Sequence, residues 1–210
     1  MKKFYISFLL LILSVGAHAQ SGAFYQEVTW GMRHIASAQS LQQIDKAVSI
    51  FKDLSTRNQG SYLPDYYVAL SLLFKADYLA ELSDRDAAVD GAMEYIARAE
   101  KLSPNNPELE FLRGYALTTR MLGDPAYRAD LYAPQIIGHF EKVMEMEPSN
   151  PRPPTLMAFL MMNLPDYFYS DEHSPCGLAQ QAIQLYPGYH KDHLLVWGRE
   201  LAERILQDCN

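Results

Sequence analysis

The strongest constraint on the fold is a helical pattern that recurs along the chain and ends each time at a proline. One copy consists of Ala92, Ile96, Ala99 and Pro104, and the next of Ile136, Phe140, Val143 and Pro148. The internal spacing of the four positions is the same in both copies. Residues three and four positions apart share one face of an α-helix, so each copy predicts an amphipathic helix. Because proline cannot continue a helix, each copy also predicts where its helix ends.

The residues after each of these helices predict a tight turn and the start of another helix. Segments 103–107 (SPNNP) and 148–151 (PSNP) each end in a second proline, which suits the first turn of a helix. The Ser and Asn residues beside the prolines favour turns and N-caps. Weaker copies of the pattern occur earlier, at 47–54, and later, at 179–187. Since the chain also lacks the sustained alternation typical of strands, we predict an all-α fold that repeats helix, turn and helix.

This pattern resembles the tetratricopeptide repeat family (TPR), in which small residues let the two helices of a hairpin pack closely and a proline closes the second helix. The best match covers residues 86–150, where Gly114 takes the close-contact position and 122–124 (LGD) resembles the turn between helices. The copies follow one another at about 39 to 45 residues, against about 34 in regular members, and HEAT-like helix pairs have a similar period of about 40–47.

The resemblance implies a right-handed α-α superhelix of about four TPR-like helical hairpins with a C-terminal capping helix. We expect hairpins over 24–56, 63–102, 107–147 and 152–186, and the capping helix over 190–207. The chain also resembles a group of short exported TPR proteins of Gram-negative bacteria, which has no agreed activity. That likeness rests on Asn150-Pro151-Arg152, the loop around Pro165, and Cys176.

The first residues have the pattern of a secretory signal peptide. Lys2 and Lys3 precede an apolar stretch, and residues 16–19 (GAHA) end it with the small residues that a signal peptidase reads. The stretch is too short for a membrane anchor, and no Cys lies at the cut for lipid attachment. We therefore expect a signal peptide over 1–19, cleavage between Ala19 and Gln20, and one TPR-like domain over 20–210. The mature protein is then periplasmic or secreted, with no further segment apolar enough to cross a membrane.

The net charge bears on the class of partner, and the cysteine content bears on whether the chain contains a disulfide. The net charge of −7 argues against nucleic acid as a partner. Cys176 and Cys209 are the two cysteines of the chain, and an oxidising compartment would allow them to pair. A final helix over 190–207 would overshoot its neighbour by roughly 10 Å, so the disulfide stays an open possibility at this stage.

The concave face of such a hairpin stack is the candidate binding surface. On the family's register the first helix of each hairpin lines this face, with a mixture of aromatic and polar side chains that suits an extended peptide or an apolar helix. The candidate partner-binding residues are Tyr66, Phe74, Phe111, Tyr115, Thr119, Arg152, Phe159 and Asn163. The alternative is that these aromatic side chains are simply core.

No motif in the sequence indicates catalysis, a cofactor or a metal. Nucleophile elbows, phosphate loops, dinucleotide fingerprints and paired-cysteine motifs are all missing. His190 and His193 are spaced for a metal, but no third ligand is fixed by spacing. We expect no enzyme, but an exported scaffold that binds a protein or peptide partner of the cell envelope. The alternative is a periplasmic small-ligand carrier or an accessory subunit of an envelope transport system.

Overall fold

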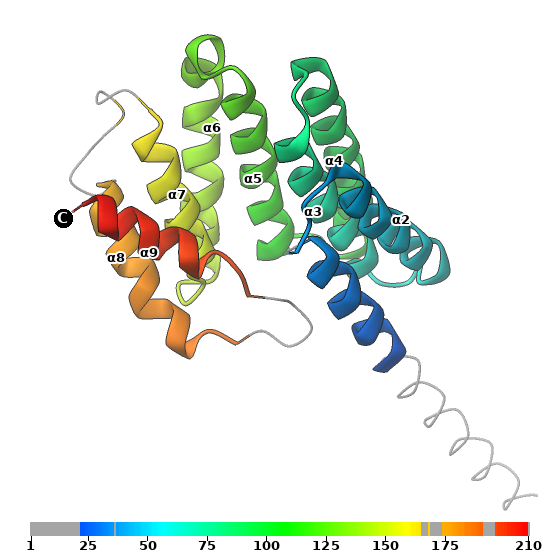
Figure 1. Cartoon of the computed structure of the whole chain (residues 1–210). Helices are drawn as coiled ribbons and strands as arrows, with labels where there is room; N and C mark the ends of the chain where they lie inside the picture. Colours follow the sequence, from blue (N-terminus) through cyan, green and yellow to red (C-terminus); the bar gives the residue numbers. More distant parts are fainter. Residues whose placement is uncertain (1–21, 36, 165–167, 169–173, 191–195, 210) are drawn as a thin grey trace, which may run out of the picture.

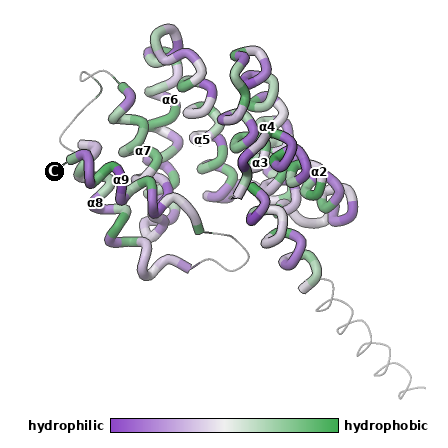
Figure 2. The backbone as a smooth tube through the Cα atoms, in the orientation of Figure 1, coloured by the Kyte–Doolittle hydropathy of each residue, from purple (hydrophilic) through white to green (hydrophobic). Residues whose placement is uncertain are grey.

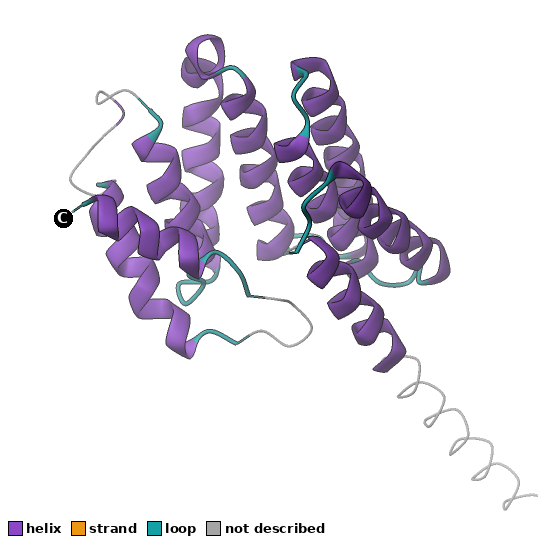
Figure 3. Cartoon of the chain, viewed as in Figure 1, coloured by secondary structure: helices purple, strands orange, loops and turns teal. Residues whose placement is uncertain are grey.

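The computed structural model describes residues 22–35, 37–164, 168, 174–190 and 196–209. Within these ranges the secondary structure is helical and contains no strand (Figure 3). The prediction of an all-α fold is confirmed. The predicted signal peptide, with its cleavage site between Ala19 and Gln20, lies outside the described residues.

The helices follow one another with short turns and pack in chain order. A first helix covers residues 22–35. The later helices are α2 (Leu41–Arg57), α3 (Leu63–Tyr78), α4 (Leu82–Leu102), α5 (Pro107–Gly123), α6 (Pro125–Met146), α7 (Arg152–Met162), α8 (Pro175–Leu185) and α9 (Arg199–Asp208). Each helix from α2 to α9 contacts the next one in the sequence, so the hairpins stand side by side in a row (Figure 1). The predicted hairpins over 63–102, 107–147 and 152–186 correspond to α3–α4, α5–α6 and α7–α8, and the first predicted hairpin contains the helix over 22–35 and α2.

The turn between α4 and α5 shows how the sequence sets the helix boundaries. Helix α4 ends just before Pro104, and Pro107 is the first residue of α5. The Asn106 side chain caps α5, because its oxygen accepts a hydrogen bond of 2.8 Å from the backbone N–H of Glu108. This bond satisfies one of the backbone donors that a helix N-terminus leaves without an intrahelical partner. The turn chemistry read from the sequence therefore operates as predicted.

Close packing and ion pairs hold neighbouring helices together. A Cβ atom placed on Gly114 of α5 would lie 2.6 Å from the Phe140 ring of α6, so only glycine allows this approach. The predicted close-contact role of Gly114 is confirmed. Between α4 and α6, the Arg128 guanidinium donates two hydrogen bonds, of 2.8 and 2.6 Å, to the Asp86 carboxylate. These bonds hold the pKa of Asp86 below its usual value.

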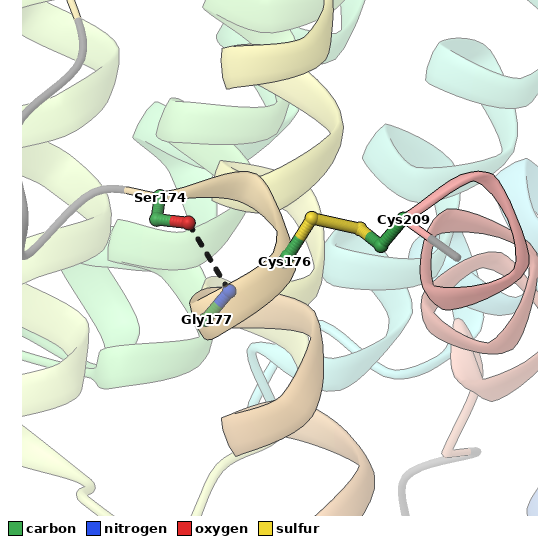
Figure 4. The surroundings of a disulfide bond; sticks show 4 residues. All are labelled: Ser174, Cys176, Gly177 and Cys209. Carbon is green, nitrogen blue, oxygen red and sulfur yellow. Dashed lines mark hydrogen bonds between the residues drawn. A yellow bond between two sulfur atoms is a disulfide. The ribbon is translucent and has the colours of Figure 1, made fainter.

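The last helix is shorter than predicted, and this allows a disulfide. The described part of the predicted 190–207 helix is not helical before Arg199, because Gly198 has a left-handed backbone with a φ of 102°. Helices α8 and α9 are therefore of similar length, 11 and 10 residues, so the predicted overshoot is wrong. Cys176 at the start of α8 and Cys209 after α9 form a disulfide with Cα atoms 6.0 Å apart (Figure 4).

The distribution of apolar residues agrees with helices that pack against one another. Polar and apolar residues interleave along the helices rather than forming long apolar spans (Figure 2). No helix in the described ranges is both long and apolar enough to span a bilayer.

Candidate functional site

A cavity of about 640 Å³ lies where helices α3, α5 and α7 meet the C-terminal segment. Aromatic and aliphatic side chains make up most of its lining. The lining residues are Phe74, Asp77, Tyr115, Thr118, Thr119, Leu122, Leu156, Phe159, Trp197, Gly198, Glu200, Leu201 and Arg204. A mainly apolar cavity with a few polar groups, of this volume, is typical of small-molecule sites.

Trp197 covers the aromatic wall of this cavity. Its ring centroid lies 5.7 Å from that of Phe74, 5.7 Å from that of Phe111 and 5.5 Å from that of Tyr115. The Tyr186 hydroxyl donates a hydrogen bond of 3.1 Å to the Trp197 carbonyl oxygen. Helix α9, which follows Gly198, packs against α7 and α8 (Figure 1). The C-terminal segment thus brings an indole ring onto a face formed by α3 and α5, which come much earlier in the chain.

The polar groups of the cavity fall into two sets. At the edge, Asp77 is half-exposed, interacts with Tyr115, and forms an ion pair of 3.8 Å with Arg85. Desolvation by the surrounding protein raises the pKa of Asp77, and both partners offset only part of that rise. Burial also raises the pKa of Tyr115 well above its usual value. In the wall, Thr119 Oγ1 and Trp197 Nε1 are buried without a hydrogen-bond partner among the described residues.

A buried ion pair lies in the interior between α5 and α7. The Arg152 Nη2 atom lies 2.5 Å from Glu108 Oε1, and both side chains are at most 1% exposed. The same guanidinium donates hydrogen bonds to the hydroxyls of Tyr66 (3.4 Å) and Tyr189 (3.1 Å), and Nε donates to Asn150 Oδ1 (3.2 Å). Because a buried charge is tolerated only with partners of this kind, the cluster is a structural element of the core.

Some of the predicted groove residues line the cavity in the structure, and the others lie outside it. Those that line the cavity are Phe74, Tyr115, Thr119 and Phe159. The predicted groove contacts at Tyr66, Phe111 and Arg152 are not accessible in this structure, because all three side chains are at most 1% exposed and lie outside the cavity lining. Asn163 is exposed and lies outside the cavity lining, where its side-chain amide donates to the Phe159 carbonyl oxygen (2.7 Å). The alternative interpretation, that these aromatic side chains are core, holds for Tyr66 and Phe111, and Tyr115 is also buried, at 8% exposed, although it lines the cavity.

The reasoning from sequence missed the C-terminal contribution to the cavity. Trp197, Leu201 and Arg204 line it, yet all three fall in the segment predicted to be a capping helix. The Trp197-Gly198 pair was an available signal, because a glycine inside a predicted helix marks a break. His193 lies outside the described residues, and within them no group of three or more His, Cys, Asp and Glu side chains could hold a metal.

Comparison with known proteins finds similarity of fold rather than of sequence. No family model matches the chain, and no curated protein sequence is significantly similar to it. Among solved structures, the chain is similar to the HusA haemophore from Porphyromonas gingivalis, with a TM-score of 0.76. The alignment covers 90% of this chain and 92% of that one, at 20% sequence identity. The likeness shows that the two chains share an all-helical fold over nearly their whole length.

Proposed function

We propose that the protein is an exported, non-catalytic carrier that holds a small, flat, apolar ligand in the cavity between α3, α5, α7 and α9. The observation that supports this most is the lining itself, in which Phe74, Tyr115 and Phe159 meet from three separate helices. Flat aromatic surfaces of this kind suit the stacking of a planar ligand. In this proposal the hairpins are degenerate TPR-like repeats.

The similarity of fold suggests which ligand class to test first. HusA is named a haemophore, so porphyrins are the first candidates for this cavity. Arg204 at the exposed end of the lining would pair with a ligand carboxylate. The signal-peptide pattern and the Cys176–Cys209 disulfide both support a periplasmic or secreted location.

The chemistry of the lining favours recognition of the ring rather than of a bound iron. Haem iron is usually held by His, Met, Cys or Tyr. The cavity lining, as far as the structure describes it, contains no His, Met or Cys. Burial raises the pKa of its one tyrosine, Tyr115, which opposes the phenolate that would bind iron. We therefore expect iron-free porphyrin to bind as well as haem.

A small-ligand carrier fits this site better than the peptide-binding scaffold expected from the sequence. A peptide in a groove needs an extended accessible surface. Here Trp197 lies against rings of α3 and α5, α9 packs on α7, and three of the predicted contact residues are internal. The remaining space is a bounded cavity of about 640 Å³.

The test is a titration of the exported protein with haem and with iron-free protoporphyrin IX, followed by absorbance and by thermal shift. We expect both to bind and to raise the melting temperature. Phe159→Ala should weaken both roughly tenfold, which corresponds to about 1.4 kcal/mol. Met162→Ala is the matched control, since Met162 lies on the same helix but outside the lining. Failure of the folded protein to bind either compound would contradict the porphyrin proposal, and binding of haem alone would contradict ring recognition.

A further inference from the structure

We propose that the place occupied by the Trp197 indole is itself a binding subsite for a flat aromatic group of the ligand, and that the indole leaves this place when the ligand enters. This inference rests on the proposed carrier function and assigns a specific position to the ligand within the cavity. In the empty protein, Trp197 is then a substitute ligand supplied by the chain itself.

The first support is that the walls of this place do not depend on Trp197. Phe74 comes from α3, and Phe111 and Tyr115 come from α5, whereas the indole arrives from the segment before α9. Phe74 and Tyr115 contact each other at a centroid distance of 6.1 Å, and Phe111 contacts Phe140 at 5.9 Å. The Arg152 guanidinium also lies over the Phe111 ring, 4.9 Å from its centroid. Because these contacts hold the walls without the indole, the same rings would receive another flat aromatic group of similar size.

The second support is that the indole fits this place incompletely. Trp197 Nε1 is buried and has no hydrogen-bond partner among the described residues. An indole N–H that water cannot reach loses its hydrogen bond to solvent, which makes the occupied state less favourable than the ring contacts alone would suggest. Thr119 Oγ1, in the same lining, is also buried without a hydrogen-bond partner among the described residues. A ligand without a buried N–H at this point would avoid the first of these losses.

The third support is that the indole can leave while α9 stays in place. Gly198 separates Trp197 from α9, and its φ of 102° lies in a region that residues with a side chain rarely adopt. A Cβ atom on Gly198 would lie 2.8 Å from the Tyr186 hydroxyl. Helix α9 is fixed independently, by its contacts with α7 and α8 and by the disulfide at its far end. Gly198 is therefore the position at which Trp197 can move relative to α9, and this movement would break the hydrogen bond from the Tyr186 hydroxyl to the Trp197 carbonyl oxygen.

The direction of a change in affinity tests this proposal. We would titrate the wild type and Trp197→Ala with protoporphyrin IX and confirm folding by circular dichroism. If the indole competes with the ligand, its removal should tighten binding by roughly tenfold or more, since the apparent affinity is the intrinsic affinity multiplied by the fraction of protein that is competent to bind. Weaker binding by Trp197→Ala would overturn the inference, because it would make the indole a ligand contact. Trp30→Ala, at the one other tryptophan of the chain, is the matched control and should bind like the wild type.

A second measurement keeps Trp197 intact. In ¹⁵N-labelled Trp30→Phe protein, Trp197 gives the single indole N–H resonance. We expect this N–H to be protected from exchange with water in the empty protein and to exchange rapidly once protoporphyrin IX is bound. Continued protection in the complex would overturn the inference while leaving the carrier function standing. Failure of both the wild type and Trp197→Ala to bind would instead contradict the proposed function, and the inference with it.

Discussion

Replacement of either partner of the Arg152–Glu108 pair should destabilise the whole fold rather than weaken ligand binding alone. The two charges are 2.5 Å apart and almost fully buried. They join the first turns of α5 and α7, two helices that also line the cavity. Arg152→Met leaves a buried carboxylate without its guanidinium, and Glu108→Gln leaves a buried guanidinium without its counter-charge.

The expected cost follows from this burial. Removal of one member of a buried ion pair costs about 3–5 kcal/mol, because the remaining charge keeps its desolvation penalty and loses its partner. Folded domains are stable by about 5–15 kcal/mol, so either single variant should lose a large part of the total. The double variant Glu108→Leu/Arg152→Met removes both charges. Its loss should fall short of the sum of the two single losses by about 2 kcal/mol or more.

Equilibrium unfolding in urea, followed by far-UV circular dichroism, measures these free energies. The reasoning is refuted if either single variant lies within about 0.5 kcal/mol of the wild type, the size typical of surface substitutions. It is also refuted if the losses in the double variant simply add. Where Glu108→Gln remains folded, porphyrin affinity should be close to that of the wild type, because the Glu108 side chain does not line the cavity.

Three further predictions concern the disulfide, the Asp86 carboxylate and the helix contact at Gly114. Reduction of the disulfide, or Cys176→Ser/Cys209→Ser, should lower the free energy of unfolding by roughly 2–4 kcal/mol in urea melts, because the bond closes a loop with a sequence separation of 33; an unchanged midpoint would show that α9 docks without it. Asp86→Asn should lower stability at pH 7. Because the pKa of Asp86 is depressed in the folded state, the stabilisation is present above its unfolded value near 3.8 and is lost as the pH falls through the folded value. The difference between Asp86→Asn and the wild type should therefore shrink in acid, and a constant difference from pH 7 to pH 2 would contradict this. Gly114→Ala should cost about 1–3 kcal/mol through overpacking against the facing ring of α6, whereas Gly138→Ala, with open space around it, should gain roughly 0.5–1 kcal/mol.

The hairpins could be predicted because the signals that define them are local. The stripe from Ala92 to Ala99, the closing Pro104 and the capping Asn106 all lie within 15 consecutive residues. Even the close helix contact at Gly114 follows from the repeat register. None of these features requires knowledge of what lies on the far side of a helix.

The cavity could be predicted only in part because burial of a helix face depends on distant segments. Phe111 and Tyr115 are one turn apart on α5, so the register places both on the concave face. How far either ring stays accessible depends in part on Trp197, which comes near the other end of the chain and lies against both. Likewise, Arg152 is an ordinary surface residue by type, and only the arrangement of Glu108, Tyr66 and Tyr189 stabilises it in the interior.

The position of Trp197 also bears on why this fold would serve a carrier. A concave face with Phe74, Tyr115 and Phe159 uncovered would expose contiguous apolar surface, and proteins in water keep such patches small unless they bind something. In this structure the indole covers part of that surface. A ligand that takes the place of the indole covers the same surface. The protein with the indole in place and the protein with ligand bound therefore differ little in exposed apolar area, whereas an open groove would expose its apolar surface each time the ligand left. The ligand gains less from burial because it replaces a ring that was already buried. This lowers affinity but eases release, which is what a carrier needs when it must give up its ligand. A peptide-binding groove does not need to release its ligand in this way. An indole from the same chain that covered such a groove would only reduce the surface available to the peptide.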